Sequence, residues 1–122
     1  MQLFTTFVKD NVNVEFAHDG AEALDRLFRR GRFRDIPLPN VVVLDLNVPL
    51  LNGHEVLNAC KSNSQTRRIP VVVWSGSDNP DDIRKAYDLG CCGYIVKSPL
   101  LNEIEAQLAA FSDFWLKTVR YA

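Results

Sequence analysis

Long apolar segments, an excess of charge of either sign and paired cysteines are all missing from this sequence of 122 residues. No apolar run approaches the roughly 20 residues that a membrane-spanning helix needs, and no signal-peptide pattern opens the chain. With 14 basic and 15 acidic residues the net charge is −1, so no overall field favours nucleic acid or a membrane as a partner. These absences predict a cytoplasmic protein. The length is near the commonest domain size, so it predicts a single small domain.

The chain has three cysteines and one short cluster of arginines. The three cysteines, Cys60, Cys91 and Cys92, show no metal-ligand spacing, and we interpret them as reduced thiols of a cytosolic protein. Residues 29–34 contain four arginines at the end of an expected helix. We interpret this stretch as a solvated helix end rather than a nucleic-acid site.

Strand and helix patterns alternate along the chain. Short apolar, β-branched runs predict strands at 12–17, 41–44, 69–74 and 93–96. Apolar residues at helical spacing predict helices at 21–30, 54–62, 80–89 and 102–119, and residues 3–11 resemble the tail of an amphipathic helix. The alternation predicts an α/β fold with a mostly parallel, doubly wound sheet that helices cover on both faces.

A carboxylate stands where the second of these strands ends. The run from Val41 to Leu44 is apolar throughout, as in strands buried on both faces, and Asp45 follows it. In open α/β sheets ligands bind at the carboxyl ends of the strands, and an aspartate held there can attack phosphorus and form an acyl phosphate. The alternative is an aspartate that merely caps the following turn.

Two further polar side chains end the next two strands. Ser75 follows the run at 69–74, and Lys97 follows the run at 93–96. A hydroxyl can bond one oxygen of a phosphoryl group on Asp45, and an ammonium can neutralise another. Either residue alone could be a turn residue or a solvated side chain, but Asp, Ser and Lys in this order at successive strand ends indicate one site.

With these residues in place, the chain resembles a response-regulator receiver domain, the CheY-like branch of the flavodoxin-like fold. The resemblance implies that Asp45 is the phosphoacceptor, that Ser75 and Tyr94 are the switch residues and that Lys97 is the family's lysine. It also implies that the backbone carbonyl of Asn47 binds Mg²⁺ together with Asp45. The protein would then accept a phosphoryl group from a sensor histidine kinase and signal by protein contact, without being an enzyme itself. The end of the chain resembles single-domain regulators partnered with bacterial phytochromes.

The chain departs from the family at two places. Ser98 separates Lys97 from Pro99, where the family usually has Lys-Pro, so a cis bond before proline would have to lie between Ser98 and Pro99 or be absent. At the front, we expect residues 1–122 to be a receiver domain that is truncated relative to the family. It lacks the first strand with its terminal acidic pair. An alternative alignment places that strand end at residues 7–11.

A missing first strand has two physical consequences. Magnesium prefers near-octahedral oxygen ligands, so Asp45 with one carbonyl predicts weak or absent Mg²⁺ binding. The family's strand order would also leave a gap at the centre of the sheet, where unpaired backbone groups are costly to bury. The chain could be a truncation, another chain could fill the gap, or the sheet could close with an altered topology.

Three other functions remain open at this stage. A degenerate receiver would serve as an interaction module without phosphorylation, which the missing acids favour. A haloacid-dehalogenase phosphatase also uses a strand-end aspartate, but it needs a second one where this chain has Asn47. A flavodoxin-like cofactor binder would need a phosphate-cradling loop after its first strand, and no such loop is visible.

The last predicted helix carries more apolar surface than one sheet can cover. One face along it is apolar: Leu101, Ile104, Leu108, Phe111, Trp115 and Val119. We expect Ile104 and Leu108 to cover the sheet. Phe114, Trp115 and Leu116 add large apolar groups beyond it, on more than one face. We therefore predict a homodimer through this helix, with the neighbouring Tyr94 strand.

Overall fold

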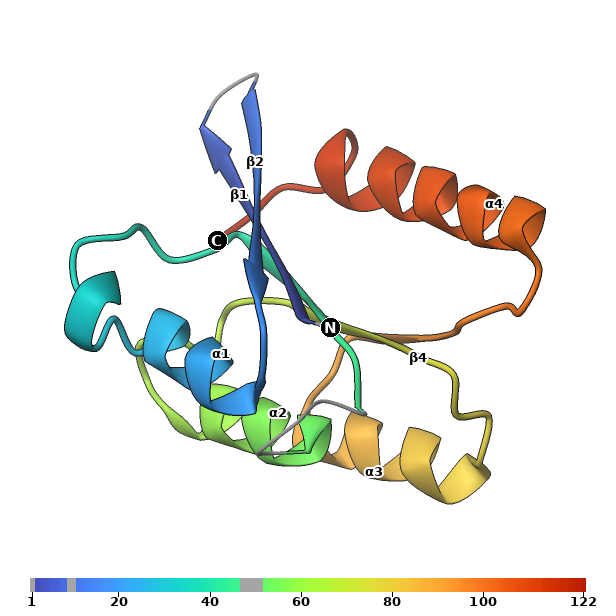
Figure 1. Ribbon diagram of the computed structural model, residues 1–122, viewed down its shortest axis with the longest axis horizontal. Helices are drawn as coiled ribbons and strands as arrows, with labels where there is room; N and C mark the ends of the chain where they lie inside the picture. The colour runs from blue at the N-terminus through green and yellow to red at the C-terminus, as the bar shows by residue number, and fades with distance from the viewer. Residues whose placement is uncertain (1, 9–10, 47–51) are drawn as a thin grey trace.

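The computed structural model describes residues 2–8, 11–46 and 52–122 (Figure 1). Its strands are β1 (Gln2–Val8), β2 (Asn11–Ala17), β3 (Val41–Leu44), β4 (Val71–Ser75) and β5 (Gly93–Val96). Its α-helices are α1 (Gly20–Leu27), α2 (Gly53–Ser62), α3 (Pro80–Leu89) and α4 (Leu101–Phe111). A 3-10 turn, η1 (Gly31–Phe33), follows α1, and a π-helical turn, η2 (Ser112–Leu116), follows α4.

The five strands form one sheet in the order β2-β1-β3-β4-β5. Strands β3, β4 and β5 are parallel, as the sequence predicts. Strand β1 is antiparallel to both of its neighbours. The strand order is that of the flavodoxin-like fold, but the position between β2 and β3 is held by a strand that runs the other way.

The helix predicted at residues 3–11 is wrong, because Gln2–Val8 forms β1. Its residues are mostly aromatic or β-branched, which suits a strand, and they pair along their full length with β2. On its other side β1 pairs with β3, with Leu3 opposite Val43 and Thr5 opposite Val41. The position expected to be vacant is therefore filled by this chain itself, with an altered topology, and the backbone groups along β3 gain partners.

The direction of β1 also decides the alternative alignment of residues 7–11. Because β1 is antiparallel to β3, its Val8 end lies at the edge of the sheet where β3 begins, away from Leu44. The alignment therefore does not bring a strand end to the edge where Asp45 lies. Residues 9 and 10 themselves lie outside the described part of the chain.

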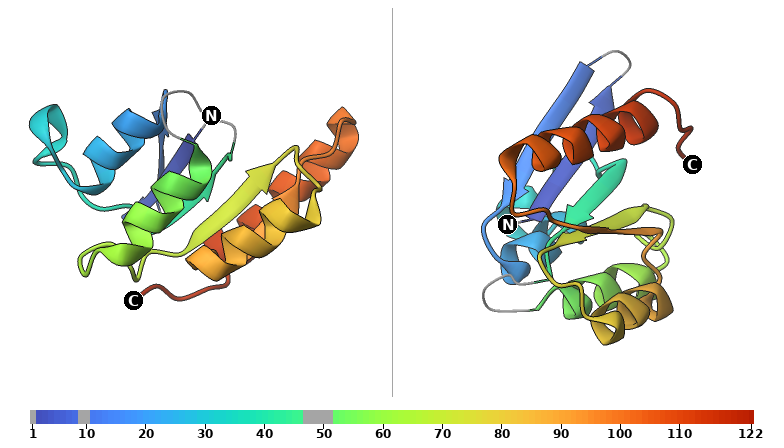
Figure 2. Two further views of the ribbon diagram at one scale, coloured as in Figure 1. Left: turned by 90° about the horizontal axis from the view of Figure 1, so that it is seen from below. Right: turned by 90° about the vertical axis from the view of Figure 1, so that its right-hand side faces the viewer.

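Helices lie on both faces of the sheet, as predicted (Figures 1 and 2). Helices α1, α2 and α3 lie side by side over one face, and their apolar side chains pack on Val42, Leu44 and Val73. Helix α4 lies over the other face, where Phe111 packs with Val41, Val43 and Val72. The alternation of neighbouring valines between the two clusters follows from the period of two in a strand.

Polar side chains begin three of the helices, and a glycine ends one of them. Asp19, Asn52 and Asn79 cap α1, α2 and α3, each side chain accepting a hydrogen bond from a backbone N–H of the first turn. Gly90 ends α3 with φ 108°, a conformation that favours glycine. Within the described residues, no helix is long and apolar enough to cross a membrane.

The last helix differs from its prediction in length and in the side it presents. Helix α4 ends at Phe111, and the π-helical turn replaces the predicted continuation toward residue 119. Leu108, which we expected to cover the sheet, is 45% exposed, while Ile104 is half-buried. Phe111 supplies the buried contact instead, so α4 covers the sheet mainly near its C-terminal end.

Candidate functional site

Asp45 lies at the carboxyl edge of the sheet, directly after β3. All four residues of β3 are buried, and the strand pairs on both sides, with β1 and β4. The Asp45 side chain is 14% exposed, so its carboxylate is largely covered but reachable. A rigid, doubly paired strand thus holds the carboxylate at the place where α/β sheets bind ligands.

Lys97 directly follows β5, and its side chain reaches Asp45 past the end of β4, which lies between β3 and β5. Its Nζ lies 3.3 Å from Oδ2 of Asp45, although 52 positions separate the two residues. The backbone N–H of Lys97 donates to the carbonyl O of Ser75 at 2.7 Å, which extends the β4–β5 pairing by one residue. The main chain of Lys97 is therefore fixed, while its side chain is 43% exposed.

Ser75 ends β4, which lies between β3 and β5. It is fully buried, and its hydroxyl oxygen accepts a hydrogen bond from the N–H of Ser77 at 3.2 Å. In the sheet register, Leu44 is opposite Val73 and Ser75 is opposite Val96. Ser75 thus lies at the same edge of the sheet as Asp45 and Lys97.

Tyr94 is half-buried and packs against the apolar cluster on the α1–α3 side. Its hydroxyl donates to the carbonyl O of Ser77 at 2.9 Å. The same Ser77 donates through its own hydroxyl to Asp82 at 2.6 Å. The loop after β4 is therefore held to β5 by Tyr94 and to α3 by Asp82.

The described residues do not fit a strong magnesium site. Asn47, the expected carbonyl ligand, lies outside the described residues. Among those that are described, no three His, Cys, Asp or Glu side chains come together as metal ligands. The reversed β1 brings no acidic strand end to this edge, and the Asp45 carboxylate already faces a cation, Lys97. One carboxylate beside an ammonium is a poor ligand set for a divalent cation.

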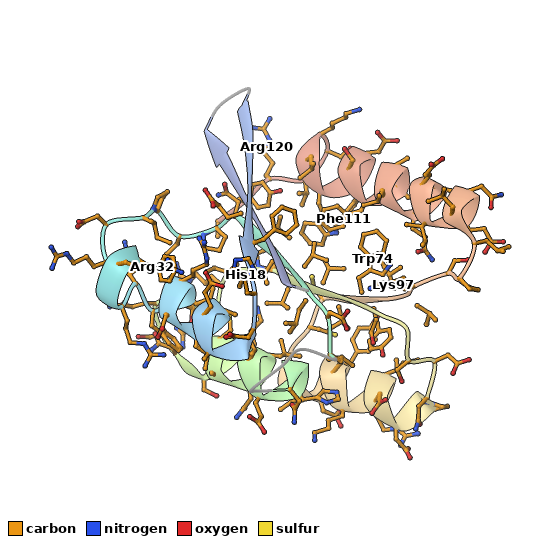
Figure 3. All side chains as sticks on the ribbon, viewed as in Figure 1. His18, Arg32, Trp74, Lys97, Phe111 and Arg120 are labelled. Carbon is orange, nitrogen blue, oxygen red and sulfur yellow. The ribbon has the colours of Figure 1, made fainter. Side chains whose placement is uncertain are left out.

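The basic stretch at residues 29–34 lies beside α1 and not at this site (Figure 3). Arg30 pairs with Asp25 at 3.2 Å and Arg32 pairs with Glu22 at 3.1 Å. These residues and His18 border a hollow of about 410 Å³. Arg30 and Arg32 are thus neutralised within the chain, in keeping with a solvated helix end.

Gly53 shapes the site, although it carries no chemical group that would mark it in the sequence as a functional residue. A Cβ at this position would lie 2.6 Å from the carbonyl O of Asp45 and 2.6 Å from Cα of Leu46. Only glycine lets the start of α2 approach the end of β3 this closely. The Asn52-Gly53 pair in the sequence marks this turn, but it does not reveal the close approach.

Known proteins resemble this chain over most of its length. The profile of the response regulator receiver domain matches residues 1–109. The chain is 40% identical over 101 residues to response regulator Rcp1 of Synechocystis, covering 83% of this chain and 69% of Rcp1. It is 36% identical over 104 residues to the probable methanogenesis regulatory protein FilR2 of Methanothrix harundinacea, covering 84% of this chain and 66% of FilR2. The chain thus spans about two thirds of each of these two relatives.

Solved structures show the same likeness. The phosphorylated cyanobacterial phytochrome response regulator RcpA matches with a TM-score of 0.84 and 40% identity, over 86% of this chain and 75% of RcpA. The Mn²⁺-bound form of response regulator Rcp1 also matches with a TM-score of 0.84, at 38% identity, over 86% of this chain and 76% of Rcp1.

Proposed function

This chain belongs to the response-regulator receiver family of two-component signal transduction, and we propose that Asp45 is the residue on which it accepts a phosphoryl group. The observation that carries the proposal is the 3.3 Å approach of Lys97 Nζ to Asp45 Oδ2. A strand-end carboxylate with an ammonium beside it combines a nucleophile with a group that neutralises the transferred charge.

The step would run as follows. An oxygen of Asp45 attacks the phosphorus of a phosphohistidine on the kinase, and an O–P bond forms as the P–N bond breaks. The imidazole leaves with the bonding electron pair and takes up a proton from water. Lys97 then neutralises one oxygen of the new acyl phosphate, and the buried Ser75 hydroxyl donates to another. Tyr94, which is hydrogen-bonded to Ser77, responds to this change as the second switch residue.

A relative binds a divalent metal ion, whereas the described part of this chain offers few ligands for one. The matched Rcp1 structure is a Mn²⁺-bound form. Here no three His, Cys, Asp or Glu side chains of the described residues come together around Asp45, and the Asn47 carbonyl stays a predicted ligand. We propose that Mg²⁺ binds weakly, and that Lys97 supplies the charge neutralisation from within the chain.

The partner we propose is a sensor histidine kinase of the phytochrome type. Support comes from the relatives, since RcpA is a phytochrome response regulator and a further match at 41% identity is the bacteriophytochrome response regulator RtBRR. The charge balance of the chain supports protein contacts in the cytoplasm rather than nucleic acid or membrane as the output.

We also propose a homodimer through α4 and the turn that follows it. Phe114 is 52% exposed, Leu108 is 45% exposed and Val96, at the end of β5, is 38% exposed. Phe114 borders a hollow of about 280 Å³, whose other lining residues are Ile95, Gln107, Ala110, Phe111 and Trp115. An exposed aromatic residue at such a hollow, on a helix that exposes further apolar groups, is typical of an interface.

One observation favours a second candidate function. Among the described residues, no three His, Cys, Asp or Glu side chains come together as metal ligands beside Asp45. A receiver that keeps its fold but is not phosphorylated would act only as an interaction module. The test of the leading proposal also decides this alternative.

The test is intact-mass spectrometry after incubation with acetyl phosphate and Mg²⁺. We expect the wild-type chain and the Asp78→Asn control, which changes an exposed carboxylate after β4, to gain one phosphoryl group that hydroxylamine releases. Asp45→Asn should gain none. Full labelling of Asp45→Asn would identify another acceptor, and a folded wild-type chain that is never labelled would favour the interaction module.

A further inference from the structure

Gln107 on α4 joins three segments of the chain through one amide group. Its Nε2 donates to the carbonyl O of Val96 at 2.8 Å. Its Oε1 accepts from Nε1 of Trp74 at 3.2 Å and lies 3.5 Å from the backbone N–H of Ser98. The amide therefore links α4 to β4 and to the segment that follows β5.

These contacts surround two of the proposed site residues. Val96 and Ser98 are the chain neighbours of Lys97 on either side, and Trp74 is the residue before Ser75. Figure 3 shows Trp74 and Phe111 between the sheet and α4, with Lys97 close to Trp74 at the end of β5. Gln107 thus hydrogen-bonds to the main chain on both sides of Lys97.

The loop after Lys97 is also held in place from α4. The Ser98 hydroxyl donates to the carboxylate of Glu103 and accepts from the N–H of Leu100, the latter at 3.1 Å. A lysine side chain is a flexible four-carbon stem that ends in an ammonium, so the direction of the ammonium depends on a fixed main chain at the lysine. With the main chain secured at Val96 and Ser98, Lys97 starts from one defined place and direction.

We infer that Gln107 is a positioning residue that aims Lys97 at Asp45 and couples that contact to α4. The inference rests on the proposed function of Asp45 and Lys97. When a phosphoryl group on Asp45 draws Lys97 toward it, the movement pulls on Val96 and Ser98, and the amide of Gln107 passes this to Trp74 and α4. The signal would thereby reach the apolar surface around Phe114.

The first experiment is a double-mutant cycle on the rate of labelling by acetyl phosphate. We expect Gln107→Ala to slow labelling on the order of tenfold, because small misplacements of a catalytic group have effects of this size or more. In a Lys97→Ala background, Gln107→Ala should change the rate less than about twofold, because the group it positions is gone. Glu105→Ala, on an exposed position of the same helix, is the matched control and should behave as wild type.

Two results of this cycle overturn the inference. One is a Gln107→Ala rate equal to that of wild type. The other is an equal slowing in the presence and absence of Lys97, which would indicate a merely structural role. Circular dichroism of each variant reports whether it is folded.

A second experiment needs no phosphorylation, so it separates this inference from the proposed function. NMR of ¹³C-labelled lysine follows the Lys97 side chain, and Asp45→Asn should shift its resonance because the two groups are in contact. In the Gln107→Ala background, Asp45→Asn should leave that resonance nearly unmoved. An undiminished shift refutes positioning by Gln107. If the wild-type chain gains no phosphoryl group from acetyl phosphate, but the resonance shift caused by Asp45→Asn is lost in the Gln107→Ala background, only the proposed function is refuted.

Discussion

The backbone N–H of Gly53 donates to the carbonyl O of Leu46, with N and O 3.0 Å apart. This bond joins Leu46, two residues after the end of β3, to the first residue of α2. It exists only because Gly53 has no side chain, since a Cβ there would lie 2.6 Å from both Asp45 O and Leu46 Cα. The position of Asp45 thus depends on a residue that never touches its carboxylate.

The Gly53→Ala variant tests this dependence. We expect it to lower the free energy of unfolding by roughly 1–3 kcal/mol, because the backbone of β3 and α2 must separate to admit the methyl group. Urea unfolding measures the loss. Gly76→Ala is the control, since a Cβ there would have nothing within 4 Å, and it should leave stability nearly unchanged. Equal effects at the two glycines would contradict the close-approach argument.

Removal of the Lys97 ammonium should separate labelling from signalling. In a Trp115→Phe background, Trp74 is the sole tryptophan and its fluorescence reports on the contact with Gln107. We expect phosphorylation to change this fluorescence in a chain with Lys97, whereas Lys97→Ala should still accept some label but show little change. A full fluorescence response without Lys97 would mean that the signal travels by another route.

Divalent cations should bind weakly, because one carboxylate beside an ammonium is a poor site. A titration with Mn²⁺, followed by electron paramagnetic resonance of the free ion, should show no saturation at micromolar concentrations. Whatever weak binding occurs should fall further in Asp45→Asn and stay the same in Asp78→Asn. Tight one-to-one binding would show that residues outside the described part of the chain complete a metal site.

The proposed homodimer should depend on Phe114 more than on Trp115. Trp115 is half-buried and packs with the sheet, whereas Phe114 is 52% exposed and meets Trp115 edge to face at 5.2 Å between ring centres. We expect Phe114→Ala to weaken the dimer on the order of tenfold, the effect of a typical anchor residue. Sedimentation velocity at micromolar concentration measures it. Tyr87→Ala, at a 50% exposed aromatic residue of α3, is the control. A monomeric wild-type chain would refute the interface.

Stability should decline at alkaline pH in part through the thiols. Burial raises the pKa of Cys60, Cys91 and Cys92 above the ordinary value of 9.0. Above pH 9 the unfolded chain therefore binds fewer protons than the folded chain, so the free energy of unfolding falls as pH rises, whereas below pH 9 these groups contribute no slope. Urea unfolding as a function of pH measures this decline. Cys60→Ala should show a shallower alkaline decline than wild type, and an identical decline would exclude Cys60 as a source.

Local patterns were sufficient for most of the parallel half of the fold. The buried runs before Asp45, Ser75 and Lys97 became β3, β4 and β5, and the capping residues Asp19 and Asn79 begin helices. These features depend on neighbours in the chain, so they can be predicted without knowing the rest of the fold. The convergence of three strand ends follows too, because parallel strands end at one edge.

The first strand and the last helix could not be predicted in this way. Residues 2–8 contain apolar residues that fit either a short helix or a strand, and pairing with β2 and β3 decides for a strand. The helical pattern of the last segment continues to residue 119, yet α4 ends at Phe111. Packing of Trp115 and Tyr121 on the sheet favours the π-helical turn over a continued helix.

The sequence by itself determined which residues we propose for the chemistry, since a carboxylate, a hydroxyl and an ammonium at successive strand ends are local features of the chain. Only the tertiary structure decided how they are supported. The reversal of β1 sets which edge its ends reach, Gly53 admits α2 close to Asp45, and Gln107 secures the main chain on both sides of Lys97. Each of these contacts joins residues far apart in the sequence or closes a turn in space. Their free energy depends on distances and directions that no local pattern encodes.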